Sequence, residues 1–442
     1  MQPQPPPSPG RAPLPRTVAP WVALGLLVSA AGPAIGFGIG GVPHTARAGL
    51  AAGGLGSLAT VATKLLAGVQ PYSASFHGAV PFIYPPGTLA FLPIPLLAGA
   101  HHYVLAFALE MLVVVLVGVP LATRGSGRRG LSWAVLGALA AAGPLTLFRN
   151  DPAIGLLLLA AALAFSSGRP GAAFLLVFAA GLIKEYALVE LVPLAGLQLG
   201  VAVRGAGPWR ARVGSWIRPV LIGLLPTLAV LVAVEIWSGG GLLSSQLHNL
   251  DRGVEIESVP AALAMLVAGF KGIVVSRGVL GSMQISGAYL HLRLISALCA
   301  AGGVALLLLI AWRACRGGTP VGVLFSASLG VALLATPVLS PQYLDALTPC
   351  LCLAAYEVGG GMRPILLWGA IDIAALTQLE FPYLWTSVLA LARSGLVPLE
   401  LRNLSLLLVV GALLWITMRA RRVARDGDSG PPFPTAPAPA AS

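Results

Sequence analysis

Long apolar stretches with almost no charge alternate with short polar segments along most of the chain. An α-helix needs about 20 apolar residues to cross roughly 30 Å of hydrocarbon. The pattern therefore predicts an all-α, polytopic integral membrane protein, a helical bundle with about 12 transmembrane helices. The predicted spans are approximately 20–42, 86–123, 131–148, 152–166, 171–184, 186–203, 219–238, 291–312, 319–337, 343–358, 364–378 and 403–418.

The second span is longer than a bilayer requires, and we expect it to bend near His101-His102. Spans seven and eight are separated by a long polar stretch, 239–290, with one short apolar piece at 259–270. Residues 20–418 form the predicted transmembrane domain. Residues 1–19 are Pro-rich, residues 419–442 are basic and then Pro/Ala-rich, and both are predicted to be disordered tails.

Basic residues lie in short clusters between the spans. Cytoplasmic loops of membrane proteins are enriched in Lys and Arg, so we place these clusters in the cytoplasm. The spans then alternate in direction and both termini are cytoplasmic. The clusters are Arg11/Arg16, Arg124/Arg128/Arg129, Arg169, Arg204/Arg210/Arg212/Arg218, Arg313/Arg316, Arg363 and Arg419/Arg421/Arg422/Arg425.

Composition supports a membrane protein and excludes several other classes. Hydrophobic residues make up 57% of the chain, charged residues only 10%, and the mean hydropathy is +0.87. The net charge of +12 does not indicate nucleic-acid binding, because the arginines follow the loops between spans. The four cysteines and six histidines have no metal-ligand spacing, so we expect neither a metal site nor a cofactor.

Five polar segments fall on the predicted outer side of the membrane. The segment 247–258 carries five ionisable side chains, which cannot face lipid, because a charge at the bilayer centre costs on the order of 3 kcal/mol. A transporter would more naturally hold its polar groups at mid-membrane on broken helices. Convergence at one face instead predicts a site for a lipid headgroup or an external acceptor. The segments are 70–87, 149–151, 184–186, 247–258 and 340–343.

The order of these motifs resembles that of a known family. The run Asp-Arg-Gly-Val-Glu-Ile-Glu-Ser and the run Ser-Pro-Gln-Tyr are the most specific parts. The chain resembles the bacterial polyprenol-phosphate-mannose-dependent mannosyltransferases, glycosyltransferase family 87 of the GT-C fold. The matching motifs are Gly-Val-Gln-Pro-Tyr (68–72), Pro-Phe-Ile-Tyr-Pro-Pro (81–86), Arg-Asn-Asp (149–151), Gly-Leu-Ile-Lys-Glu-Tyr (181–186), residues 251–258, residues 340–343 and Leu-Arg-Asn-Leu (401–404).

The resemblance implies an enzyme in the inner (cytoplasmic) membrane of a bacterium, active on its extracytoplasmic face. Such an enzyme moves a hexose, mannose in this family, from a polyprenyl-phosphate donor to a glycan or glycolipid acceptor. Membrane lipid is then a further partner. One departure stands out, since this fold usually carries an acid in the first external loop as general base. Here residues 52–57 read Ala-Gly-Gly-Leu-Gly-Ser, and the first acid of the chain is Glu110.

Another carboxylate must therefore act as the base, or the activity is lost or changed. Asp151 is the best single candidate, although an Asp before Pro152 also suits a helix N-cap. The charged run offers further candidates, although it could be a solvated loop. The candidate catalytic residues are Asp151, Asp251, Glu255, Glu257 and His248.

Cations and hydrogen-bonding side chains of the same segments are the candidate substrate-binding residues. A guanidinium can bind a lipid phosphate with two hydrogen bonds. Lys184 could instead reach toward the membrane surface, and interfacial tyrosines are common. Glu110 and Asp372 lie within predicted spans. Each could be a functional group or could pair with a cation of the bundle. The candidate binding residues are Tyr84, Arg149, Lys184, Arg252, Gln342 and Tyr343.

Two other classes of function stay open. With its first-loop acid missing, the chain could be an inactive lipid-binding relative within a cell-envelope assembly. It could also be a flippase or transporter of lipid-linked sugars, although transporters of that kind usually contain internal repeats. The sequence shows no convincing repeat.

Overall fold

The computed structural model describes residues 56–73, 82–99, 102–128, 130–205, 208–247, 252–278, 282–287 and 291–420. The predicted first span, the N-terminal tail and nearly all of the C-terminal tail lie outside these residues. His101, His248 and Asp251 also lie outside them.

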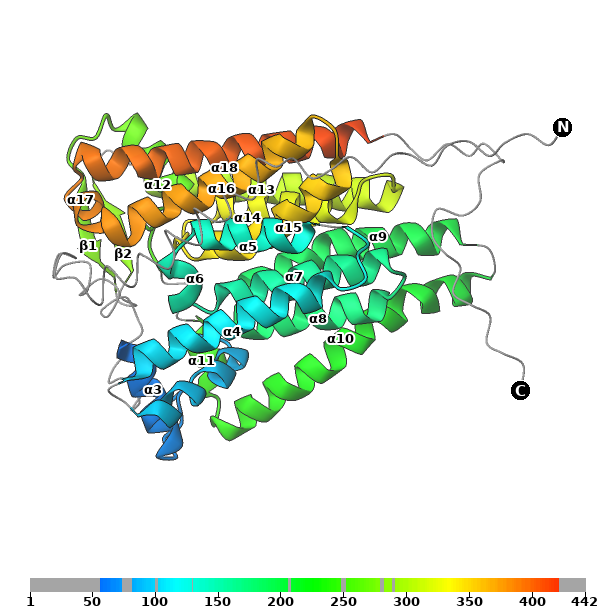
Figure 1. Cartoon of the computed structure of the whole chain (residues 1–442), viewed down its shortest axis with the longest axis horizontal. Helices are drawn as coiled ribbons and strands as arrows, with labels where there is room; N and C mark the ends of the chain where they lie inside the picture. Colours follow the sequence, from blue (N-terminus) through cyan, green and yellow to red (C-terminus); the bar gives the residue numbers. More distant parts are fainter. Residues whose placement is uncertain are drawn as a thin grey trace.

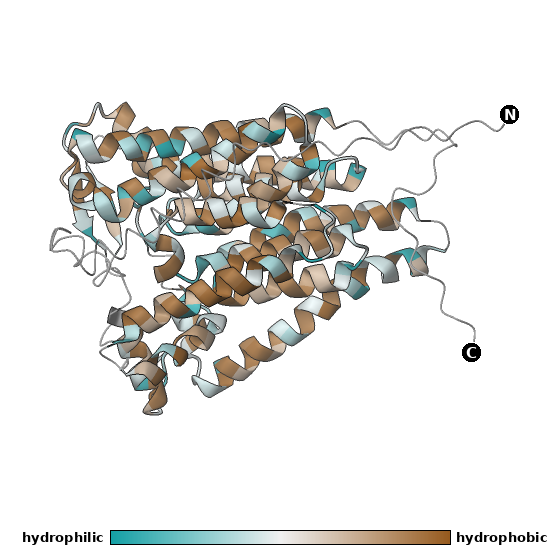
Figure 2. Cartoon of the chain, in the orientation of Figure 1, coloured by the Kyte–Doolittle hydropathy of each residue, from teal (hydrophilic) through white to brown (hydrophobic). Residues whose placement is uncertain are grey.

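The described chain is mostly helical, and its long helices run side by side (Figure 1). Among the described residues, six helical segments are long and apolar enough to cross a membrane. Hydrophobic residues occupy most of the length of these helices (Figure 2). The protein is therefore a multi-pass, all-α membrane protein. The segments are α4 (Tyr103–Thr123), η5 with α9 (Glu185–Glu190, Leu191–Arg204), α10 (Trp209–Trp237), α13 (Leu292–Arg316), α16 with η7 (Met362–Gln378, Leu379–Tyr383) and α18 (Arg393–Arg419).

Shorter helices form the centre of the bundle. The main hydrophobic core lies between them, whereas α10 and α13 are largely exposed at its periphery. The central helices cross closely, since a Cβ on Gly155 of α7 would lie 2.9 Å from the carbonyl oxygen of Ala346. They are α5 (Leu131–Ala141), α6 (Pro144–Phe148), α7 (Asp151–Ser166), α8 (Pro170–Ile183), α14 (Val321–Ala335) and α15 (Tyr343–Val358).

The predicted span 86–123 is not one bent helix. Two short 3-10 helices, η2 (Pro86–Phe91) and η3 (Ile94–Ala98), precede α4, which begins after His102. Prolines cause this break, because a proline lacks the N–H that an α-helix requires and both short helices begin with prolines. They pack with α3 (Gly56–Leu66) and α11 (Gly241–Leu247) in a second hydrophobic core against α4.

The stretch between α11 and α13 contains a β-hairpin that the sequence analysis did not predict. After α12 (Val259–Val267), strands β1 (Val274–Arg277) and β2 (Met283–Ser286) pair antiparallel, with Val275 opposite Ile285. Two hydrogen bonds, from Ile256 N to Met283 O and from Ile285 N to Val254 O, attach the 252–258 segment to β2. The hairpin, α12 and α17 (Trp385–Leu389) gather at one end of the bundle (Figure 1).

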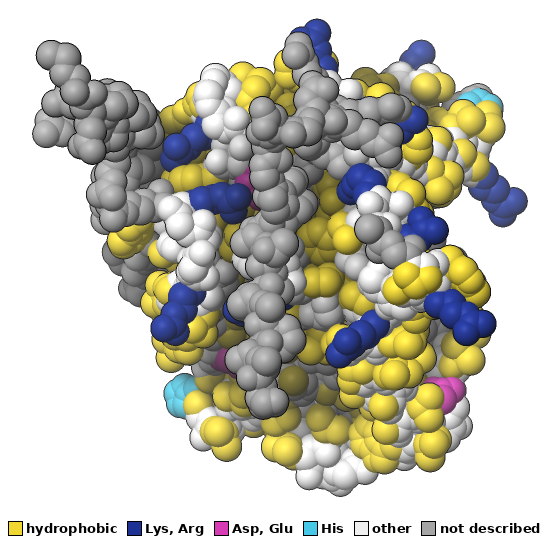
Figure 3. Space-filling view, turned by 90° about the vertical axis from the view of Figure 1, so that its right-hand side faces the viewer, with side chains coloured by type: hydrophobic (Ala, Val, Ile, Leu, Met, Phe, Trp, Pro, Cys, Tyr) yellow, Lys and Arg dark blue, Asp and Glu magenta, His cyan; other side chains and the backbone are white. Residues whose placement is uncertain are grey.

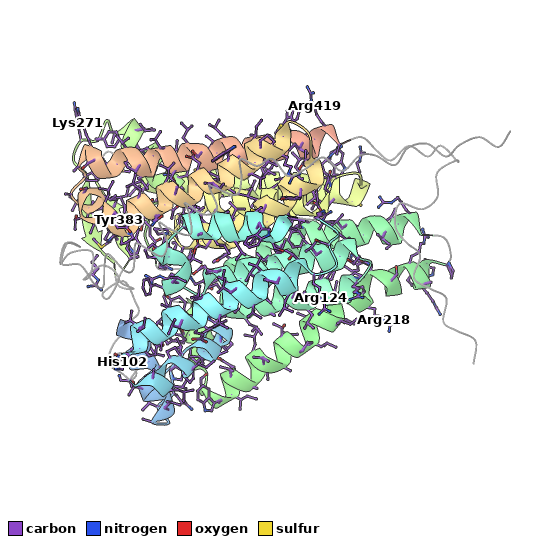
Figure 4. All side chains as sticks on the ribbon, viewed as in Figure 1. His102, Arg124, Arg218, Lys271, Tyr383 and Arg419 are labelled. Carbon is purple, nitrogen blue, oxygen red and sulfur yellow. The ribbon has the colours of Figure 1, made fainter. Side chains whose placement is uncertain are left out.

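The two ends of the bundle differ in character. We call the end with the hairpin and the 252–258 segment the loop end. Lys and Arg side chains spread over the opposite end, which we call the arginine end (Figure 3). Arg124, Arg218 and Arg419 lie there, whereas His102, Lys271 and Tyr383 lie at the loop end (Figure 4). Members of three predicted clusters, Arg124, Arg218 and Arg419, therefore lie toward one end.

Most predicted spans match helices to within a few residues, but besides the broken second span, α10 begins at Trp209 and not near residue 219. The last span was predicted to begin near residue 403, but α18 begins at Arg393. The added part contains Glu400 and Arg402, whose charges count against a span in any hydropathy pattern. Arg402 is nevertheless fully buried, and it faces a carboxylate, as described below.

Candidate functional site

Two breaks in the helices bring a carboxylate and an amine together at the loop end. Asp151 is the first residue of α7, and Lys184 occupies the extended residue between α8 and η5. Lys184 Nζ donates to Asp151 Oδ1 at 2.9 Å and to Oδ2 at 2.7 Å, and the Tyr186 hydroxyl donates to Oδ1 at 2.8 Å. Asp151 is 0% exposed and Lys184 4%, so this is a buried ion pair.

Two alternatives raised for these residues are wrong. Asp151 does not cap α7, because Asn150 holds the N-cap position and the Asp151 carboxylate bonds to Lys184 and Tyr186. Lys184 does not reach to the membrane surface, because its amine is buried against Asp151. The Arg149 guanidinium, next to Asp151 in sequence, donates instead to the Phe148 carbonyl at 2.9 Å.

Aromatic rings enclose the ion pair. Lys184 Nζ lies 4.9 Å from the ring centre of Tyr343 and 5.7 Å from that of Tyr84. The rings of Tyr186 and Tyr343 are 4.6 Å apart. An ammonium over an aromatic face is attracted by the ring quadrupole, so the tyrosines add to the stabilisation of the Lys184 charge.

A small cavity opens beside the ion pair. Its volume is about 20 Å³, enough for one or two water molecules. The segment that contains η2 closes it, and Thr88 Oγ1 donates to the Ile183 carbonyl at 2.7 Å. Burial lowers the pKa of the Arg149 guanidinium, and the nearby Tyr84 and Asp151 partly offset this effect. The lining residues are Leu58, Tyr84, Thr88, Phe91, Leu92, Phe107, Arg149, Asn150 and Lys184.

The 252–258 segment adds a second acid–base pair. The Arg252 guanidinium bonds to the Glu255 carboxylate, and Ser340 Oγ donates to Glu255 Oε2 at 3.4 Å. Burial raises the pKa of Glu255 and outweighs the opposing effect of Arg252. Burial also acts to lower the pKa of Arg252, but the charge and hydrogen bond of Glu255 leave it raised. The Ser340 carbonyl accepts a hydrogen bond from Tyr343 N, so this pair adjoins the ion-pair site through the 340–343 turn.

Glu257 belongs to a different cluster. Its backbone carbonyl accepts a hydrogen bond from Arg402 Nη2 at 2.5 Å, and Arg402 Nη1 lies 3.1 Å from Glu380 Oε2. Burial raises the pKa of Glu257 well above its usual range, and the charges of Glu255 and Glu380 raise it further. Arg402 thereby ties α18 to the 252–258 segment.

The sequence analysis did not single out Asp345 or Arg402 as site residues. Asp345 lies in the first turn of α15, is 1% exposed and interacts electrostatically with Asp151 and Lys184. Its Oδ2 atom has no hydrogen-bond partner among the described residues. The signal for both was present, since each is a charged residue inside or at the start of an apolar helix and within or just after a quoted motif.

The structure therefore brings together part of the predicted set. Tyr84, Arg149, Asp151, Lys184 and Tyr343 surround one point, and Arg252 and Glu255 adjoin them. Gln342 is half-buried at the N-cap of α15 and makes no capping bond with its side chain. His248 and Asp251 lie outside the described residues. No group of three His, Cys, Asp or Glu residues suited to a metal ion occurs in the described part of the chain.

Comparison with known proteins adds no relative. No protein-family model matches the chain, and none of the curated proteins or solved structures matches it.

Proposed function

We propose that this chain is a hexosyltransferase of GT-C type that uses a polyprenyl-phosphate sugar, with mannose as the first sugar to test. The acceptor is a glycan or glycolipid outside the cytoplasmic membrane. The observation that carries the proposal is the meeting of Asp151, Lys184, Arg149 and Arg252 with tyrosines at one end of an apolar bundle. Acids and cations so placed suit sugar transfer from a lipid phosphate.

Transfer from such a donor needs positive charge for the departing phosphate. Asp151 already neutralises Lys184, whereas Glu255 pairs with Arg252 but leaves its Nε unbonded, so Arg149 and Arg252 are the better phosphate partners. Both are guanidinium groups, which can bind phosphate oxygens with two hydrogen bonds. The Arg252 Nε atom is buried without a hydrogen-bond partner among the described residues, so it keeps a donor for a ligand.

The transfer also needs a base for the acceptor hydroxyl. Asp151 is close to Arg149 and Tyr84, but its carboxylate accepts three hydrogen bonds, which lower its basicity. Glu255 is the second candidate. Its raised pKa makes its carboxylate a stronger base than an ordinary glutamate. A hexose does not fit a cavity of about 20 Å³, so donor binding here requires movement of the lining η2 segment.

The proposal includes an orientation in the membrane. Twelve spans, with the arginine end and both termini in the cytoplasm, place the loop end outside. Reporter fusions at Gly127 and Gly205 should read cytoplasmic, and fusions at Ser75 and Asn249 should read external. A cytoplasmic reading at Asn249 would contradict an external site.

The test is direct measurement of transfer. The purified full chain is reconstituted with radiolabelled polyprenyl-phosphate mannose and a membrane extract as the source of acceptors. We expect labelled product, and a fall of about 100-fold or more in Arg252→Met, since removal of one transition-state contact commonly costs this much. Lys271→Met is the matched control, because Lys271 is an exposed cation of the loop end (Figure 4). Absence of turnover by the parent chain would refute the proposal.

One observation favours a second candidate, a non-catalytic lipid-binding protein. Asp151 is fully occupied by Lys184 and Tyr186, and the usual first-loop acid is absent. In that case the parent chain would bind polyprenyl-phosphate mannose, measured as a rise in thermal stability, without label reaching any acceptor.

A further inference from the structure

An acidic residue lies on the exposed surface of the bundle, midway along a long apolar helical segment. Asp372 belongs to the segment Met362–Tyr383, ten residues after its start and eleven before its end. At 1.5 Å per residue, each end is roughly 15 Å away. The Asp372 side chain is exposed, and it accepts a hydrogen bond of 2.5 Å from Ser405 Oγ of α18.

The surface around Asp372 is otherwise apolar. Helices α16 and α18 pack against each other and present one continuous exposed face. Acidic groups within membranes almost always face the bundle interior or a wet cavity, because a carboxylate in lipid is costly. One hydroxyl satisfies only one of its acceptor positions. The neighbouring exposed side chains are Ile365 and Trp368 of α16, Leu379 of η7, and Leu401, Leu404 and Leu408 of α18.

A second copy of this chain does not offer the missing partner. In the six long apolar segments, Arg402 lies nine residues from the start of α18, but it is fully buried and faces Glu380, so it is not available to a second copy. Arg218 of α10 lies at the arginine end, with Arg124 and Arg419 (Figure 4). Contact of two copies through the same face would bring Asp372 against Asp372, which is repulsive.

The chain's own first predicted span does not offer it either. Residues 20–42 contain no Lys, Arg or His, and Ser29 is their one side chain that can donate a hydrogen bond other than Trp21. This span could cover the face, but it could not neutralise the carboxylate.

We propose that the face formed by α16 and α18 around Asp372 binds a transmembrane helix of another membrane protein, one that carries Lys or Arg near its middle. The apolar side chains supply the packing surface and Asp372 supplies the charge that selects the partner. The inference is independent of sugar transfer, because the face lies outside the Asp151 site.

The test uses a defined probe in lipid vesicles. The probe is a Leu/Ala transmembrane peptide of about 23 residues with one central Lys and a donor fluorophore. The full chain carries an acceptor on a C-terminal tag. We expect the Lys peptide to associate about tenfold more tightly than the same peptide with a central Leu, the scale of a polar contact between helices. Asp372→Leu should remove this difference.

Charge reversal separates recognition from loss of fold. Asp372→Lys should lose the Lys peptide and gain a peptide with a central Glu. Glu110→Gln is the matched control, since Glu110 is also an acid within a long apolar helix, and it should bind the Lys peptide as the parent does. Equal association of the Lys and Leu peptides with the parent chain would overturn the proposal.

Two further outcomes would identify a different occupant of the face around Asp372. Energy transfer between two copies that disappears in Asp372→Leu would identify a homomeric contact. A disulfide formed within one chain between Ser29→Cys and Ser405→Cys would identify the first span as the cover. Either result would overturn the proposal.

Discussion

Two of the buried ion pairs at the loop end, Asp151–Lys184 and Glu380–Arg402, are built differently. The carboxylate of Asp151 accepts three hydrogen bonds, and the Lys184 ammonium lies over two tyrosine rings. Glu380 faces Arg402 at 3.1 Å, but neither of its oxygens has a hydrogen bond among the described residues. Glu257 and Glu400 also act electrostatically on this second pair.

The difference lies in charge balance and in hydrogen bonding. One lysine faces one hydrogen-bonded carboxylate at the first pair, although Asp345 lies nearby. At the second pair one arginine serves three carboxyl groups, an excess of negative charge that favours proton uptake by these groups. A buried pair stabilises a fold only when its other polar atoms are satisfied. The Asp151–Lys184 pair is therefore preorganised for binding. The Glu380–Arg402 pair instead makes the stability of the 252–258 segment depend on pH.

The largest expected effect is that of Asp151→Asn on the rate of sugar transfer. If Asp151 is the base, its loss should lower the rate of sugar transfer by about 100- to 10,000-fold. Initial rates are compared at equal amounts of folded protein, because Lys184 loses its counter-charge in this variant. A rate within about threefold of that of the parent would show that Asp151 is not the base and would assign this role to Glu255.

Lys184→Met tests how much the first pair depends on its charge balance. It leaves Asp151 as an uncompensated buried carboxylate, which should reduce the free energy of unfolding by about 3–5 kcal/mol. The double variant Asp151→Asn/Lys184→Met should recover more than half of this loss. The measurement is unfolding in detergent, and equal losses in the single and double variants would show that the charge balance does not matter.

Arg402→Met should cost less, about 1–3 kcal/mol, the penalty of leaving a buried polar group unsatisfied. A carboxyl group that loses its cation can take up a proton, so the cost should shrink as pH falls. Unfolding is followed at pH 5 and pH 8. A loss as large as that of Lys184→Met, and equal at both pH values, would remove the contrast between the pairs.

Glu257→Gln should give the smallest effect. The raised pKa of Glu257 means that the folded chain binds this proton more tightly than the unfolded chain does. Its contribution to stability therefore falls as pH rises from the unfolded pKa, about 4.3, through the folded pKa. The variant lacks this loss. The difference in Tm between the variant and the parent should therefore be more positive at pH 8 than at pH 5, by roughly 2–4 °C. An unchanged difference would place Glu257 in an uncoupled, solvated position.

Most of the helical framework could be predicted from the sequence. Apolar length is a local signal, so spans such as 152–166 and 171–184 match α7 and α8 closely. The β-hairpin was missed because its strands are four residues each and pair only with each other and with the 252–258 segment. The start of α18 was missed because Arg402 reads as polar, although tertiary packing buries it.

Membership of the site could be predicted better than its contacts. The analysis grouped Asp151, Lys184, Tyr84 and Tyr343, and the structure brings them together. Arg149 is the cation beside Asp151 in sequence, whereas the ion-pair partner Lys184 is 33 residues away and is placed by the packing of α7 against α8. Pairing across helices depends on packing geometry, which no local pattern contains.

The lengths of the helices have a consequence for insertion into the membrane. A helix of 29 residues such as α10 is about 44 Å long, and it can cross the hydrocarbon alone. The central helix α15 has 16 residues, about 24 Å, and contains Asp345, Pro349 and Glu357. It becomes stable in the bilayer only when α7, α14 and α16 surround it. We therefore expect α15 to leave the translocation machinery together with neighbouring helices, so that the residues of the site reach their places late in biosynthesis.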